Sequence, residues 1–212
     1  MTKILSVDND QFILEFINDV LSKEGHQVVT AGDGLSALDI LETYTPDVIF
    51  VDLVMPNING KKLCKIIRGM QKLKHVCLII FSAVAAEEEM DFAELGANGC
   101  IAKGPLEEMA QNITAVVDQC DRLSSQRLPE ELMGTENLHP RGITEELLSV
   151  KRHFEIILDK MSEGILEITY EGRIVYANPT ALSLIDISEK NLLGSHFVKV
   201  FAEDDRQRIE EL

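Results

Sequence analysis

Four polar side chains each stand at the end of a short apolar run in this sequence: Asp8, Asp52, Ser82 and Lys103. Apolar runs of this length that are rich in β-branched and aromatic residues predict strands buried on both faces. If these strands are parallel, their carboxyl ends meet at one edge of the sheet, which is where ligands bind in open α/β sheets. We therefore expect the four side chains to lie close together.

The types of these four side chains suit phosphoryl chemistry. Carboxylates at one sheet edge repel each other unless a cation neutralises them, and Mg²⁺ prefers hard oxygen ligands while keeping several waters. A lysine beside a hydroxyl and a metal can hold the oxygens of a phosphoryl group. A carboxylate that accepts phosphate becomes an acyl phosphate. Together, the four residues predict that Asp52 accepts a phosphoryl group. Any one of them alone could equally be a solvated side chain at the end of a strand.

The elements that must position these residues follow a regular alternation between Lys3 and Leu123. Five apolar runs alternate with segments whose apolar residues recur at helical spacing. Five strand–helix units predict an α/β fold, a (βα)5 doubly wound parallel sheet with right-handed crossovers and helices on both faces. The expected strands are Ile4–Val7, Gln27–Thr30, Val48–Val51, Cys77–Phe81 and Cys100–Ala102, and the expected helices span about 12–21, 35–41, 63–67, 86–96 and 106–123.

The second part of the chain has a different pattern. Serine, proline and glycine residues in 124–142 interrupt any long helix and predict a linker after a first domain of residues 1–123. In 143–161 the apolar residues recur at spacings of four and three, a heptad seam. This helix either pairs with a second subunit or packs against its own neighbour. The seam consists of Ile143, Leu147, Val150, Phe154, Ile157 and Met161.

Composition excludes several classes of protein. The chain has 212 residues, with 20 basic against 36 acidic side chains and a formal charge of -16. We therefore expect no nucleic-acid partner and no docking on an anionic membrane. No secretory signal is expected, because Asp8 and Asp10 interrupt the apolar start. We interpret all four cysteines as reduced packing residues, and we expect a cytoplasmic protein.

Residues from about 2 to 122 resemble the response-regulator receiver domain of two-component signalling. The resemblance is carried by Val7-Asp8-Asn9-Asp10, the block Val51–Pro56, Phe81-Ser82-Ala83, and Gly96–Gly99 leading to Lys103. It implies that Asp52 accepts phosphate from a histidine kinase. It also implies that Asp8, Asn9, Asp52 and the Val54 carbonyl arrange Mg²⁺, and that Ser82 and Lys103 contact the phosphoryl group as switch residues.

The sequence departs from this family pattern at three positions. Asn9 stands where the family has a second acidic residue, so we expect weaker magnesium binding. Cys100 replaces the usual aromatic residue, and Gly104 separates Lys103 from Pro105. A further expectation is slow self-dephosphorylation, because the apolar residues Val54 and Val84 flank the site and cannot orient an attacking water.

Residues from about 150 to 212 resemble the first half of a PAS sensory domain, which is an α+β fold. We assign the partial PAS domain itself to residues 162–212. A hairpin around Glu171-Gly172 and a helix opening at Asn178-Pro179 are expected there. The resemblance carries over no ligand residue, so the PAS ligand is unknown. His196 is interpreted as a surface residue. The resemblance also suggests a homodimer through the 143–161 helix and the PAS region.

The leading hypothesis is a response regulator that relays the phosphorylation state of Asp52 to its PAS module. The receiver would catalyse its own phosphorylation, but no conventional enzyme domain is recognised in the chain. One alternative is a degenerate receiver that serves only as an interaction and dimerisation module. Another is the amino-terminal part of a larger hybrid histidine kinase or cyclic-dinucleotide enzyme.

Overall fold

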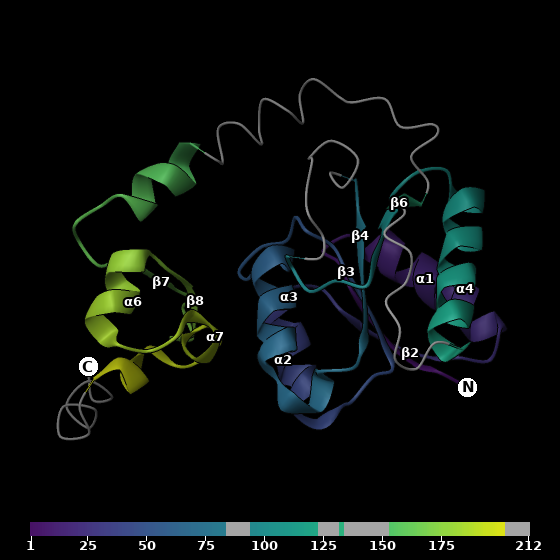
Figure 1. Ribbon diagram of the computed structural model, residues 1–212, viewed down its shortest axis with the longest axis horizontal. Coiled ribbons are helices and arrows are strands. Elements are labelled where there is room, and N and C mark those ends of the chain that lie inside the picture. Colours follow the sequence, from purple (N-terminus) through teal and green to yellow (C-terminus); the bar gives the residue numbers. More distant parts are fainter. Residues whose placement is uncertain (84–93, 123–131, 134–152, 202–212) are drawn as a thin grey trace. The chain divides into compact units, whose positions relative to one another are not determined.

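The chain divides into two units, which we call the first unit, Met1–Pro140, and the second unit, Arg141–Leu212. The computed structural model describes residues 1–83, 94–122, 132–133 and 153–201 (Figure 1). The division falls within the segment expected to be a linker. Most of that segment, most of the helix expected at 86–96, and the seam residues Ile143, Leu147 and Val150 lie outside the described residues.

The first unit is a parallel sheet in the order β2-β1-β3-β4-β5-β6, and the (βα)5 prediction is confirmed. Figure 1 shows α1 and α4 on one face of this sheet and α2 and α3 on the other. The strands are β1 Lys3–Val7, β2 Gln27–Ala31, β3 Val48–Val51, β4 Cys77–Ser82 and β5 Gly99–Ala102. The helices are α1 Gln11–Lys23, α2 Gly34–Thr43, α3 Gly60–Gly69 and α4 Leu106–Arg122, with a 3-10 turn, η1, at Gln71–Leu73.

Burial in the core explains why the central strands are unbroken apolar runs in the sequence. All four residues of β3 are buried, as expected for a strand covered by helices on both faces. On the α1 and α4 side, Phe50 and Phe81 pack edge to face with ring centroids 6.4 Å apart. The helix residues of the same cluster include Ile13, Ile17, Leu21, Met109, Ile113 and Val117.

A sixth strand, β6 Leu132–Met133, extends the sheet beyond β5. It pairs in parallel with Cys100 and Ile101 and comes from the segment expected to be a linker. A strand of two residues is too short to leave a periodic pattern in the sequence. The fold class is unchanged, but the sheet is one short strand wider than predicted.

Two of the four cysteines form a disulfide, so the prediction that all four are reduced was wrong. Cys77 at the start of β4 is bonded to Cys120 near the end of α4, with the Cα atoms 6.2 Å apart. The pair is 43 residues apart in sequence, and only the docking of α4 on the sheet brings it together. Cys64 and Cys100 are free and buried, and burial raises the pKa of each thiol to about 12.

The second unit contains the predicted hairpin, formed by β7 Leu166–Ile168 and β8 Ile174–Ala177. Gly172 lies in its turn with a φ of +79°, a conformation in which glycine is favoured. Residues 153–159 are helical and precede the hairpin. The remaining elements are α6 Pro179–Ile185, α7 Glu189–Leu192 and a 3-10 turn, η3, at Phe197–Val200. His196 is exposed, in agreement with its interpretation as a surface residue.

One fully buried side chain, Asn178, joins three segments of the second unit. Its Oδ1 accepts hydrogen bonds from the amides of Ile165 and Ala181, both at 2.9 Å. Its Nδ2 donates to the carbonyls of Leu158, at 3.0 Å, and Glu163, at 2.9 Å. The hydrogen-bonding capacity of the amide group is therefore filled, and the 153–159 helix is held to the start of α6.

No helix within the described ranges is both long enough and apolar enough to cross a membrane.

Candidate functional site

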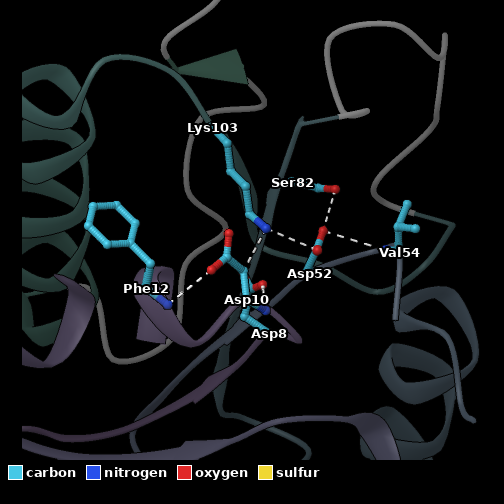
Figure 2. A network of polar contacts seen from close by, with 7 residues as sticks. All are labelled: Asp8, Asp10, Phe12, Asp52, Val54, Ser82 and Lys103. Carbon is cyan, nitrogen blue, oxygen red and sulfur yellow. Dashed lines mark hydrogen bonds and ion pairs between the residues drawn. The ribbon is translucent and has the colours of Figure 1, made fainter. Parts of the chain in front are cut away.

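The four side chains singled out in the sequence lie together at the carboxyl edge of the first unit's sheet (Figure 2). The strands that carry them, β1, β3, β4 and β5, are consecutive neighbours in the sheet. Asp8 follows β1, Asp52 follows β3, Ser82 is the last residue of β4, and Lys103 follows β5. Their proximity follows from parallel strand ends meeting at one edge.

A hydroxyl and an ammonium group hold the Asp52 carboxylate. Ser82 Oγ donates to Asp52 Oδ1 at 2.5 Å, and Lys103 Nζ lies 3.0 Å from Asp52 Oδ2. The backbone amide of Val54 also points to Asp52 Oδ1, at a longer 3.4 Å. Asp52 is only 6% exposed, so these contacts form where solvent screening is weak.

The same ammonium group neutralises a second buried carboxylate. Lys103 Nζ lies 2.7 Å from Asp8 Oδ2, and Asp8 is 1% exposed. Burial raises the pKa of Asp8, and the nearby Lys103 charge and hydrogen bond oppose that rise. The Lys103 ammonium also lies 5.9 Å from the centroid of the Phe81 ring. One cation thus bridges two carboxylates at the sheet edge.

The polar residues in the acidic turn after β1 have different surroundings. Asp10 caps α1, because its Oδ1 accepts from the amide of Phe12 at 2.9 Å, and its own amide donates to Asp8 Oδ1 at 2.9 Å. The Asp10 side chain is therefore turned toward the helix, as Figure 2 shows. Asn9 is exposed beside this turn.

The oxygen groups at this edge fit a magnesium ion. Among the described residues, no group of three or more His, Cys, Asp or Glu side chains is arranged to hold a metal. A metal here would therefore rely on two carboxylates together with amide, carbonyl and water oxygens, a donor set that Mg²⁺ accepts. That Asp8 and Asp52 already share one cation shows that the position attracts positive charge.

The sequence did not predict one contact next to the site, between Asn57 and Asp33. Asn57 Nδ2 donates to Asp33 Oδ2 at 2.7 Å, which ties the loop after Asp52 to the start of α2. The Asn57-Ile58-Asn59-Gly60 stretch reads as a turn, but nothing in the sequence links it to a residue 24 positions away.

We expect Asp33 to stabilise the first unit at neutral pH and to lose this contribution in acid. Burial acts to raise the pKa of Asp33, but hydrogen bonds from Ser36 and Asn57 outweigh it and lower the pKa below its ordinary value of 3.8. A carboxyl with a depressed pKa in the folded state contributes stability above its unfolded pKa and loses it as the pH falls through the folded pKa. Urea unfolding from pH 7 to pH 3 should therefore show the difference between wild type and Asp33→Ser shrinking below about pH 4. A difference independent of pH would contradict this.

The comparisons with known proteins agree with this arrangement. The model of the response regulator receiver domain matches residues 4–114, and the model of the PAS fold matches 152–212. The chain is 31% identical over 170 residues to the alkaline phosphatase synthesis transcriptional regulatory protein PhoP of Bacillus subtilis, a match covering 79% of this chain and 67% of PhoP. It is 29% identical over 116 residues to the response regulator MprA of Mycobacterium tuberculosis, a match covering 54% of this chain and 50% of MprA.

Solved structures show the same fold. The chemotaxis response regulator CheY4 of Vibrio cholerae is 25% identical with a TM-score of 0.52, over 57% of this chain and 98% of that one. The phosphorylated cyanobacterial phytochrome response regulator RcpA is 25% identical with a TM-score of 0.51, over 55% of this chain and 91% of that one. The chain spans between 39% and 67% of the length of the first curated relatives. It belongs to the response regulator receiver domain family, and a PAS fold follows its receiver.

Proposed function

We propose that Asp52 accepts a phosphoryl group from a histidine kinase and that this is the event the response regulator senses. The observation that carries the proposal is the buried Asp52 carboxylate, held between the Ser82 hydroxyl and the Lys103 ammonium. A hydroxyl donor and a cation on opposite oxygens of one carboxylate are the partners that a phosphoryl group needs once it is attached.

The proposed transfer forms one bond and breaks another. An oxygen of Asp52 attacks the phosphorus of a phosphohistidine, the P–O bond forms, the P–N bond breaks, and the imidazole leaves with the electron pair. The Lys103 ammonium lies 3.0 Å from Asp52 Oδ2, where it would balance negative charge on the reacting group. In the proposed phosphorylated state, the Ser82 hydroxyl donates to a phosphoryl oxygen instead of to the carboxylate.

We propose that Mg²⁺ is held by Asp8, Asn9, Asp52 and the backbone carbonyl of Val54. When bound, the ion neutralises negative charge that develops on the transferring group. Asn9 is neutral, so this site has one charge fewer than a site with a second acidic residue at that position. Asp10 does not replace it, because its side chain caps α1.

Incubation of the purified chain with Mg²⁺ and acetyl phosphate tests the proposal. We expect an acid-stable, alkali-labile label on wild type and none on Asp52→Ala, because only a carboxylate at this position forms the acyl phosphate. Asp47→Asn is the matched control, since Asp47 accepts from the Lys3 amide at the amino-terminal end of the same sheet. The label should also decay slowly, because Val54 beside Asp52 is apolar and orients no water.

No label on wild type at high Mg²⁺ would contradict the proposal. It would favour the second candidate, a receiver that acts only as an interaction and dimerisation module. The specific feature favouring that candidate is Asn9, which gives the metal site a neutral oxygen in place of a carboxylate.

We further propose that the chain forms a homodimer through the 143–161 helix and the PAS region, so that the receiver relays its state to the PAS module. Two seam residues within the described helix support this, because Phe154 is 62% and Ile157 50% exposed. Unpartnered apolar side chains at heptad spacing favour pairing with a second helix.

Replacing both Phe154 and Ile157 with glutamate is expected to convert the dimer to a monomer, because it places charges in the seam. Light scattering after size-exclusion chromatography measures the mass. Glu155→Gln, on the same helix but outside the seam, should leave the mass unchanged. A monomeric wild type would contradict the proposal.

We also propose a cytoplasmic location, and we still expect this acidic chain to contact no nucleic acid directly. PhoP is described as a transcriptional regulatory protein. A gel-shift titration with duplex DNA at low salt tests the expectation, and retention of the DNA would contradict it.

A further inference from the structure

The loop Leu53–Asn59 joins β3 to α3 and carries part of the proposed site. Asp52 immediately precedes this loop, and Val54, whose carbonyl is a proposed magnesium ligand, lies within it. The loop closes on itself, because the amide of Gly60 donates to the carbonyl of Leu53 at 3.1 Å. The conformation of the loop therefore sets where the Val54 carbonyl lies, two residues after Asp52.

Asn57 holds the middle of this loop in an uncommon conformation. Its φ is +59°, in the left-handed region that asparagine tolerates better than most residues. Its side-chain amide donates to Asp33 Oδ2 at 2.7 Å. The other oxygen of Asp33 accepts from the amide of Ser36, also at 2.7 Å, and caps α2. Asp33 thus uses both oxygens to join the loop to the start of α2.

The backbone packs closely against the loop at two glycines, Gly34 and Gly60. A Cβ atom on Gly34, the first residue of α2, would overlap the carbonyl of Ile58, and one on Gly60 would overlap the carbonyl of Asp52. Ile58 itself is fully buried. Because packed interiors transmit strain, we expect a shift at Asn57 to reach the backbone next to Asp52.

We propose that Asp33 and Asn57 form a latch that sets the position of the Leu53–Asn59 loop and, through it, the geometry of the Asp52 site. Asp33 and Asn57 would act on the site only through the loop, so both are positioning residues. The consequence for metal binding and phosphorylation rests on the proposed function, whereas the consequence for the loop does not.

Two variants remove the latch while preserving the local backbone. Asn57→Gly keeps the left-handed conformation accessible but lacks the amide. Asp33→Ser keeps a side-chain oxygen to cap α2 but has no second oxygen for Asn57. Asp47→Ser is the matched control, because it removes a carboxylate-to-amide hydrogen bond of 2.8 Å at the other end of the sheet.

Hydrogen–deuterium exchange of peptides spanning residues 52–56 measures the loop, and titration calorimetry with Mg²⁺ measures the site. We expect faster exchange in both latch variants and a magnesium Kd raised about tenfold, as for other supporting contacts of metal ligands. The double variant should be no worse than either single one, because the two residues form one contact. Asp47→Ser should change neither measurement.

Unchanged exchange at residues 52–56 in both latch variants would overturn the latch. Faster exchange with an unchanged magnesium Kd would overturn its control of the site. If wild type binds no Mg²⁺ and takes no label, the proposed function fails, and the exchange measurement still decides whether the latch holds the loop.

Discussion

Replacing Lys103 with methionine is expected to lower the free energy of unfolding of the first unit by about 3 kcal/mol. Lys103 is the shared cation of two buried carboxylates, at 2.7 Å from Asp8 and 3.0 Å from Asp52. Methionine has similar length but no charge, so both carboxylates lose their partner where water does not replace it. The same variant should take up label from acetyl phosphate more slowly, because in the proposed reaction Lys103 also balances the charge of the attacking oxygen.

Urea unfolding followed by circular dichroism measures the change in stability, and Lys65→Met, an exposed lysine on α3, is the matched control. The loss should shrink as the pH is lowered, since protonation of Asp8 removes one of the two repelling charges. Added Mg²⁺ should stabilise the variant more than wild type if the ion takes the position between the carboxylates. A variant as stable as Lys65→Met at neutral pH would show that the bridge contributes nothing to the fold.

Asn178→Asp is expected to lower the free energy of unfolding of the second unit by about 3 kcal/mol. The substitution exchanges an amide nitrogen for an oxygen. That oxygen then faces the carbonyls of Leu158 and Glu163, to which the amide donated at 3.0 and 2.9 Å. Two acceptors are left unsatisfied beside a new buried negative charge, which costs far more than a lost surface contact.

The expected structural result is release of the 153–159 helix from α6, because Asn178 is bonded to Leu158 at the end of that helix. Thermal unfolding gives the stability, and hydrogen exchange of the peptide covering 153–161 gives the docking. Asn191→Asp, the same substitution at an exposed position on α7, should leave both measurements nearly unchanged. If the amides of residues 153–161 stay protected from exchange in Asn178→Asp, the helix is held by other contacts.

The sequence alone determined the fold class of the first unit and the neighbourhood of its site. Every residue of β3 is apolar because the strand is covered on both faces, and such a run is visible without coordinates. Asp8, Asp52, Ser82 and Lys103 could be placed together because parallel strands end at a common edge. These inferences rest on patterns that repeat along the chain.

Individual contacts between residues far apart in the chain were decided only by the tertiary structure. The Asp33–Asn57 hydrogen bond and the Cys77–Cys120 disulfide bridge 24 and 43 residues. Arg68 likewise reaches the carbonyl of Gly96 at 2.6 Å. Helix and strand periods report which face of an element is buried, but not which side chain on that face meets which partner. That pairing depends on how the helices dock on the sheet, so these contacts exist only in the folded chain.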